Sequence, residues 1–267
     1  MAWRDAILSP FRHRELVVRL VRRELAARYR GSMLGPLWAI ALPLASLGIY
    51  TIAFGSGLRG SARPAGSEDA PFAIVLFSGL FLFQILGEML SGGPSLIRSN
   101  ATYVKQIVFP VEILPVVALL VALFNATVSG AILLVAYTAT VGVPPATALW
   151  LPVAGLPIAV LGLGISYALS ALGLFVRDLA QIVGLASMAL LFGSPIFYSL
   201  DALPEHLRGI IGASPVAVSV TAARTALLEG ATPALAPLAW SLLAALVVLA
   251  GGRALFGRLR PHFADVA

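Results

Sequence analysis

The stretch that decides the fold class of this chain is Arg14–Leu44, RELVVRLVRRELAARYRGSMLGPLWAIALPL. Its first half is rich in arginine, and its second half is uncharged and apolar. The same contrast holds for the whole chain, because 59% of its 267 residues are apolar and only 11% are charged. So few charged residues cannot cover the solvent-exposed surface of a soluble globular protein. We therefore predict an all-α membrane protein that uses lipid as its solvent on most sides.

Six membrane-spanning helices fit the uncharged stretches. A helix needs about 20 apolar residues to cross the hydrocarbon. The candidate stretches are Gly31–Leu58, Ala70–Gly87, Ile113–Val176, Leu179–Leu200 and Gly230–Gly252. The third stretch is long enough for two spans, with a turn at Val141–Thr147, VGVPPAT. Gly209–Ala223 is too short to span, and we expect a re-entrant or interfacial element there.

The distribution of arginine predicts the orientation. Six spans put both termini on one side of the membrane, and the first 30 residues alone carry 8 of the 18 Lys and Arg residues. On the same side lie Arg98, Lys105, Arg177, Arg253, Arg258 and Arg260. The opposite side has Arg59, Arg63, Arg208 and Arg224. The positive-inside rule therefore places both termini in the cytoplasm.

Side chains suited to enzymatic or metal chemistry are sparse. Cysteine is absent, and the three histidines lack carboxylates at ligand spacing, so we expect neither catalytic residues nor a metal site. Lys105 is the only lysine and no P-loop motif occurs, so we expect the chain to lack an ATP-binding site of the P-loop type. Glu88 and Glu112 lie at span ends, and no ladder of buried carboxylates is visible. The net charge of +6 comes from arginines beside apolar spans, which favours lipid headgroups over nucleic acid.

Two amphipathic segments lie on the predicted cytoplasmic side. In Arg14–Gly31 the arginines gather on one arc of a helix, as in helices that lie in the membrane interface. That helix is either a topology anchor or a docking surface for a cytoplasmic partner. Pro94–Pro110, PSLIRSNATYVKQIVFP, is bracketed by prolines and separates apolar from polar residues. It is either a plain loop helix or a lever that a soluble domain pushes.

Several segments resemble, in collinear order, the permeases of polysaccharide-exporting ABC transporters of the type 2 family. The resemblance runs from about Glu15 to the C-terminus. It is carried by Arg14–Leu44, Leu76–Leu86, Ile97–Pro115, Phe175–Val183, Ser194–Gly230 and the tail RPHFADVA. The chain departs from the family pattern at Ser214–Pro215, where Asn-Pro is common.

The resemblance implies one ABC transporter type 2 transmembrane domain over residues 1–267. An interface helix would occupy 1–33, a six-span membrane domain 34–257 and a cytoplasmic tail 258–267. Two such permeases would form a homodimer with two copies of a separate ATPase, which binds ATP and Mg²⁺, so this chain would be no enzyme and hold no cofactor. The expected substrate is a lipid-linked polysaccharide crossing the bacterial inner membrane. The alternatives are teichoic acid, galactan or, in other type 2 exporters, lipid or drug.

The resemblance also implies roles for the two amphipathic segments and for Ser194–Gly230. Pro94–Gln106 would be a coupling helix seated in the ATPase. Ser194–Gly230 would hold two re-entrant gate helices, roughly Pro204–Gly212 and Val216–Glu229, on the outer face. The residues expected to couple to the ATPase are Arg23, Arg28, Arg30, Arg98, Asn100, Tyr103 and Lys105.

A polysaccharide is too long for a closed cavity, so it must thread through a channel, and sugars stack on aromatic rings. The candidates for the channel and gate are Trp38, Tyr50, Phe77, Phe81, Phe83, Phe197, Tyr198, Leu203 and Pro204. The alternative for each aromatic ring is packing against neighbouring helices or anchoring at the membrane interface. We favour Phe197 and Tyr198, because they precede an irregular, proline-bearing segment that must line a cavity.

The charges Arg177 and Asp178 lie in the turn between predicted spans four and five. They contact either the ATPase or the lipid-linked end of the substrate, or they pair and cap the turn, with Asp178 favoured by the helix dipole. We favour the structural role.

Two competing functions lack support: a membrane enzyme acting on lipid-linked sugars needs clustered acids, and a secondary carrier needs repeats or buried titratable groups.

Overall fold

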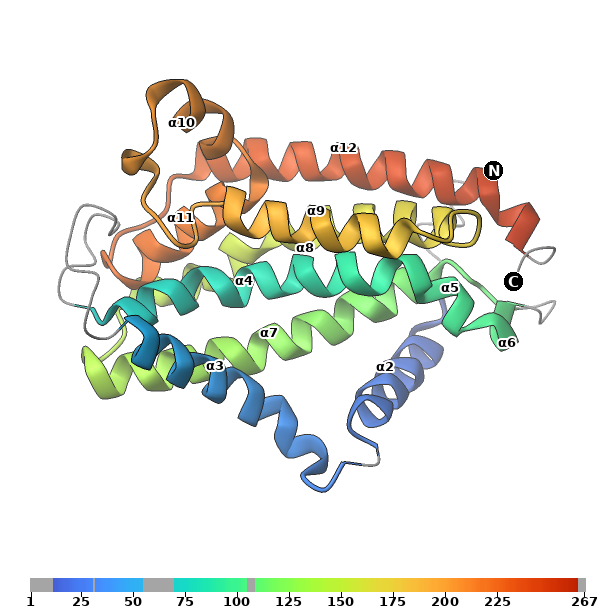
Figure 1. The fold of residues 1–267 in the computed structure, drawn as a ribbon, viewed down its shortest axis with the longest axis horizontal. Coiled ribbons are helices and arrows are strands. Elements are labelled where there is room, and N and C mark those ends of the chain that lie inside the picture. The colour runs from blue at the N-terminus through green and yellow to red at the C-terminus, as the bar shows by residue number, and fades with distance from the viewer. Residues whose placement is uncertain (1–11, 31, 55–69, 105–108, 264–267) are drawn as a thin grey trace.

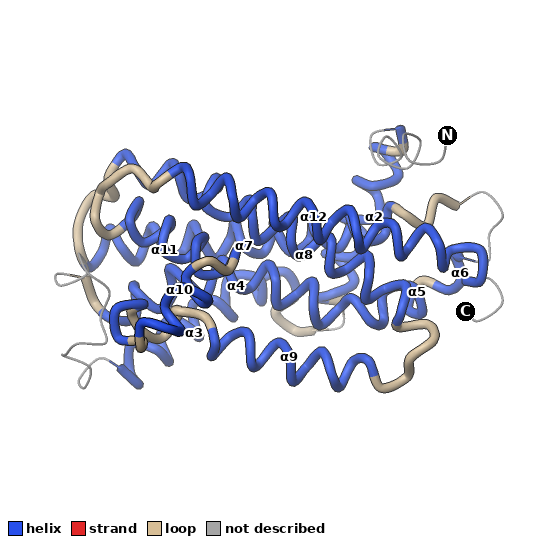
Figure 2. Tube along the Cα trace, turned by 90° about the horizontal axis from the view of Figure 1, so that it is seen from above, coloured by secondary structure: helices blue, strands red, loops and turns tan. Residues whose placement is uncertain are grey.

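The computed structural model describes residues 12–30, 32–54, 70–104 and 109–263, and these ranges contain helices, turns and loops but no strand (Figures 1 and 2). The predicted all-α class is confirmed for this part of the chain. The long helices α4 (Phe72–Gly92), α7 (Ile113–Thr140), α8 (Leu151–Leu172) and α12 (Leu235–Leu259) run side by side along the long axis.

Five helical stretches within the described residues are long and apolar enough to cross a membrane. They are Gly35–Ala53, Phe72–Ser99, Ile113–Thr140, Ala146–Leu172 and Leu235–His262. These stretches correspond to the first four predicted spans and the last one. The first stretch is formed by the 3₁₀ turn η1 (Gly35–Leu37) and α3 (Trp38–Phe54), and the fourth by η3 (Ala146–Trp150) and α8.

The predicted fifth span, Leu179–Leu200, is wrong in its length. Helix α9 (Leu179–Gly193) has 15 residues and is therefore about 22 Å long, against a hydrocarbon thickness of about 30 Å. It stops because Pro195 follows: proline forces the preceding residue out of the helical region, and Ser194 has extended angles of φ −95° and ψ 151°. A sixth span is present only if α10 (Glu205–Gly212) and α11 (Pro215–Leu227), bent by 88°, count as one broken span.

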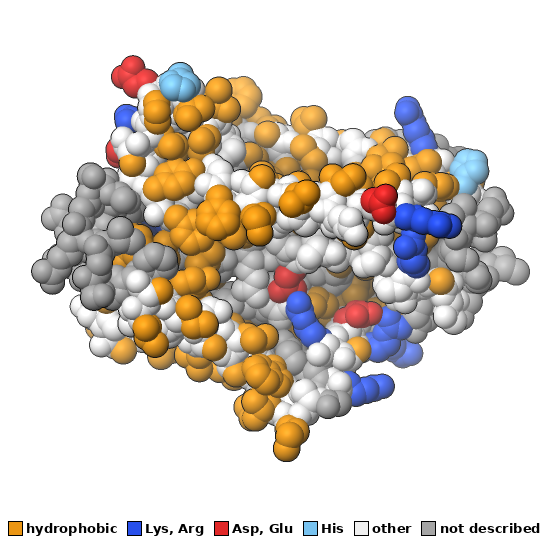
Figure 3. Space-filling view, viewed as in Figure 1, with side chains coloured by type: hydrophobic (Ala, Val, Ile, Leu, Met, Phe, Trp, Pro, Cys, Tyr) orange, Lys and Arg blue, Asp and Glu red, His pale blue; other side chains and the backbone are white. Residues whose placement is uncertain are grey.

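Helix α4 is the centre of the bundle. Of an apolar stretch of 18 residues in its span, 78% are buried inside the protein, and α4 packs against α7, α8 and α11. Helix α3 is peripheral and leaves apolar side chains such as Ile52 exposed. Figure 3 shows such apolar side chains covering this face of the molecule, whereas most of the charged ones gather toward the end that holds α2.

Helices α8 and α12 approach each other at two glycines. A Cβ atom at Gly252 would overlap the carbonyl oxygen of Gly164, and a Cβ at Gly164 would lie 2.6 Å from the Cα of Leu249. Small residues allow membrane helices to pack with their backbones in contact. These glycines therefore set the distance between the two helices.

The two ends of the bundle carry different short elements (Figure 1). At one end, α2 (Arg14–Tyr29) packs Val17 and Leu20 against Ile113 and Val117 of α7. Beside it lie η2 (Gly93–Ser95), α5 (Leu96–Ser99) and α6 (Ala101–Val104), and α12 ends nearby in η5 (Arg260–His262). The opposite end holds η4 (Leu200–Ala202), α10 and α11.

The expectation of one continuous helix over Pro94–Gln106 is wrong for the described part of that segment. The helix breaks at Asn100, whose backbone angles are φ −112° and ψ 22°. Lys105 and Gln106 lie outside the described residues. By contrast, α10 and α11 lie close to the two short helices that we predicted at 204–212 and 216–229.

Candidate functional site at the two ends of the bundle

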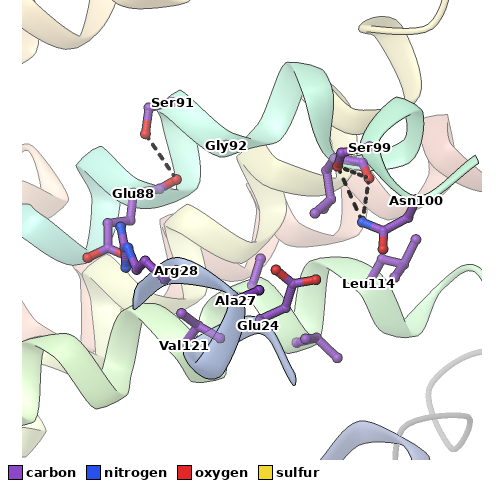
Figure 4. Close-up of a pocket in the computed structure, with 13 residues that line it drawn as sticks. Glu24, Ala27, Arg28, Glu88, Ser91, Gly92, Ser99, Asn100, Leu114 and Val121 are labelled. Carbon is purple, nitrogen blue, oxygen red and sulfur yellow. Dashed lines mark hydrogen bonds and ion pairs between the residues drawn. The ribbon is translucent and has the colours of Figure 1, made fainter. Parts of the chain in front are cut away.

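A cavity of about 460 Å³ lies where α2 meets α4, α5 and α7. Figure 4 shows Arg28 of α2 meeting Glu88 of α4 at one side of this space, whereas Glu24 of α2 lies nearer to Asn100, which follows α5. We call this region the α2 junction. It brings predicted coupling residues together with a carboxylate to which the sequence analysis gave no role.

Glu88 lies one turn before α4 ends, and its carboxylate accepts hydrogen bonds from three side chains. Arg28 Nη1 of α2 lies 2.9 Å from Glu88 Oε2, and Gln84 Nε2 of α4 lies 3.1 Å from Oε1. Asn125 Nδ2 of α7 lies 3.0 and 2.9 Å from the two oxygens. Ser129 in turn donates to Gln84 Oε1 at 2.8 Å. We call these five side chains the Glu88 cluster.

The Glu88 cluster leaves a signal in the sequence that was not recognised. Gln84 and Glu88 are four residues apart on one apolar helix, and Asn125 and Ser129 are four apart on another. Such spacing puts each pair on one helix face. What the spacing does not indicate is that the two faces meet.

Other predicted coupling residues hold α2 and α5 to the bundle. Arg23 Nη2 donates to Glu24 Oε1 at 2.7 Å and to Asn100 Oδ1 at 3.0 Å. Asn100 is buried, and its Nδ2 donates to the carbonyl of Leu96. Arg98 Nη2 donates to the carbonyl of Gly173, just after α8, at 2.9 Å.

The structure places the remaining coupling candidates only in part. Arg30 is exposed after the end of α2. Tyr103 belongs to α6, but the position of its side chain is outside the description, as is the whole of Lys105. Contact of this set with an ATPase stays a prediction.

The expected pairing of Arg177 with Asp178 does not occur. Both side chains are exposed, and among the ion pairs of the described residues none joins them. Asp178 is the N-cap of α9, but its side chain makes no capping hydrogen bond, because its angles of φ −88° and ψ 3° lie outside the extended region typical of capping residues.

At the opposite end, the segment between α9 and α10 carries four of the predicted channel and gate residues. Phe197 stacks on Phe192 of α9 with ring centroids 5.4 Å apart and an interplanar angle of 20°. Tyr198 is partly exposed, and desolvation by partial burial raises the pKa of its hydroxyl. Leu203 is partly buried and Pro204 is exposed just before α10.

Arg224 of α11 is a buried residue whose role the sequence analysis missed. Its side chain is 5% exposed, and it donates to the carbonyls of Pro195 at 2.7 Å, Ile196 at 2.6 Å and Val75 at 3.4 Å. A single arginine in an otherwise uncharged helix was the available signal. It joins α11 to α4 and to the segment that carries Phe197 and Tyr198.

The aromatic candidates in the helices divide into two groups. Phe77, Phe81 and Phe83 of α4 are buried in the core, so for them the structure shows the alternative that we left open, packing against neighbouring helices. Tyr50 is partly buried against α4, and Trp38 is exposed at the start of α3. For these last two a place in the channel stays a prediction.

Residues 15–228, from α2 to just past α11, match the model of the family described as ABC-2 type transporter. The chain belongs to the ABC-2 type transporter family. This ABC-2 transporter is therefore a membrane transport subunit, and members of this family do not themselves catalyse a reaction.

Curated relatives confirm the resemblance to polysaccharide-exporting ABC-2 permeases. The ABC-2 transporter is 27% identical over 259 residues to the O-antigen export system permease protein RfbA of Klebsiella pneumoniae, covering 94% of this chain and 95% of the relative. It is 28% identical over 258 residues to a protein of the same name from Myxococcus xanthus, covering 96% of each chain. The similarity thus extends over nearly the full length of both relatives.

Proposed function

We propose that this ABC-2 transporter is the channel-forming permease of an exporter that moves lipid-linked polysaccharide of the O-antigen type across the bacterial inner membrane. The observation that carries the proposal is the near full-length similarity to O-antigen export permeases. It includes both ends of the bundle, where the α2 junction and the α10–α11 pair lie.

The energy for export comes from a partner. The chain has no phosphate-binding loop, so two copies of a cytoplasmic ABC ATPase bind ATP and Mg²⁺ and drive a homodimer of permeases. The end with α2, α5 and α6 faces the ATPase, because the arginines that favour the cytoplasm concentrate there. The hydrogen bonds of Arg23, Arg98 and Asn100 then hold α2 and α5 in place while the ATPase pushes on these helices.

The opposite end is the exit of the channel. Phe197 and Tyr198 form an aromatic constriction for sugar rings, and α10 and α11 fold back to close it when no polymer is inside. Support comes from the bend of 88° between the two helices and from the irregular backbone at Ser194–Tyr198, which needs a protein or water-filled environment.

The decisive experiment is reconstitution. The permease, purified together with its partner ABC ATPase, should transfer lipid-linked O-polysaccharide into proteoliposomes in the presence of ATP, and the permease alone should hydrolyse none. Rescue of a strain lacking its O-antigen export permease should require both genes. ATP hydrolysis by the lone chain, or transfer of teichoic acid, galactan or lipid but not O-polysaccharide, would contradict the proposal.

A further inference from the structure

Glu88 is the only carboxylate in helices α3, α4, α7, α8, α9 and α12. Its side chain is 18% exposed. A carboxylate in an apolar helix is costly unless a positive charge and hydrogen-bond donors surround it. The Glu88 carboxylate therefore needs the groups around it to stabilise it between the helices.

The positive charge comes from a different element. Arg28, 60 residues away on α2, supplies it across a contact of 2.9 Å. Arg28 is 44% exposed and borders the cavity of about 460 Å³, so it has room to move away from α4 (Figure 4). Because Arg28 is carried by α2, the position of α2 sets how close this counter-charge lies to Glu88.

The other partners of Glu88 extend the connection into the bundle. Asn125 is 6% exposed and donates to both carboxylate oxygens, and Gln84 links Glu88 to Ser129 one turn deeper. All of these groups are neutral. When Arg28 leaves, they alone must stabilise a carboxylate between α4 and α7, which favours a different packing or hydration of that contact.

We propose that the Arg28–Glu88 ion pair is a latch that couples the position of α2 to the packing of α4 against α7. The latch rests on the proposed function, in which α2 lies next to the ATPase. With the latch closed, α2 is held against the bundle and the α4–α7 contact is locked. Displacement of α2 during the ATPase cycle opens the latch and releases that contact, so Arg28 and Glu88 are positioning residues for energy coupling.

The test uses the assembled permease–ATPase complex in proteoliposomes and measures polysaccharide exported per ATP hydrolysed. Arg28→Gln and Glu88→Gln should each lower this ratio by roughly fivefold or more, while ATP hydrolysis continues. The double variant should be no worse than the more impaired single variant, because both remove the same pair. Additive losses, or an unchanged ratio, would overturn the latch.

A matched control is present at the same end of the bundle. Arg260 and Glu112 form an ion pair with side chains 49% and 13% exposed, but it joins the end of α12 to the start of α7 and does not involve α2. Arg260→Gln and Glu112→Gln should leave the ratio unchanged. If they lower it as much as the Glu88 variants do, general stability explains the effect and the latch is refuted.

A second measurement does not depend on export. Spin labels at Ala26 of α2 and Thr127 of α7, both exposed, report the distance between the two helices. A non-hydrolysable ATP analogue should change this distance in the otherwise unaltered complex, and Arg28→Gln should produce the changed distance without nucleotide. Identical distances in all states would refute the latch. Absence of O-polysaccharide export by the unaltered complex would instead refute the proposed function.

Discussion

The guanidinium group of Arg224 donates a hydrogen bond to the carbonyl oxygen of Ile196 at 2.6 Å. A second nitrogen donates to the carbonyl of Pro195 at 2.7 Å. Both carbonyls belong to the stretch where α9 has ended and α10 has not begun, so no helix satisfies them. One arginine thus supplies the donors that this irregular backbone lacks.

Replacement of Arg224 by leucine should destabilise the α10–α11 end. Each buried carbonyl left without a donor costs about 1–3 kcal/mol, so thermal unfolding in detergent should occur at a clearly lower temperature. Arg208→Leu is the control, because Arg208 also donates to backbone carbonyls, those of Asp201 and Leu203, but is 43% exposed. Equal effects of the two substitutions would show that burial of Arg224 is unimportant.

The α8–α12 contact predicts a sharp difference between two adjacent glycines. Gly252→Ala should push the helices apart and lower the unfolding temperature, because its Cβ would overlap the carbonyl of Gly164. Gly251→Ala should be neutral or stabilising, because its Cβ meets nothing within 4 Å and alanine gains about 1 kcal/mol over glycine inside a helix. A stable, fully assembled Gly252→Ala protein would contradict the packing.

The aromatic constriction predicts a defect in transport rather than in folding. Phe197→Ala or Tyr198→Ala should slow export several-fold or leak small solutes, because in the proposed channel these rings contact the sugar, while the unfolding temperature changes little. Trp240→Ala is a suitable control, since this ring on α12 is 73% exposed. Export at the normal rate without leak in both gate variants would remove these residues from the channel.

The absence of cysteine makes the predicted topology directly measurable. Single cysteines from Leu203 to Arg208 should react with impermeant reagents added outside the cell. A cysteine at Arg258, at the end of α12, should react only after the membrane is opened. The opposite pattern would reverse the assigned orientation.

The sequence by itself determined the helical class and most of the helix positions, because these depend on local runs of apolar residues and on prolines. The five stretches long enough to span lie where hydropathy placed them, and α10 and α11 lie close to the two short helices that the family resemblance implied. The sequence also contained the signal that ends α9 early, which is Pro195 directly after Ser194. It was overlooked because the apolar run continues past the proline.

Only the tertiary structure decided which face each helix turns to its neighbours. Helices α4 and α7 are apolar nearly all round, so their sequences do not show that Phe77 points into the core or that Glu88 and Gln84 face Asn125 and Ser129. The partners of Arg28 and Arg224 are likewise distant in the chain, at separations of 60 and 28 residues. Contacts over such separations arise from helix packing, which no local pattern of residues specifies.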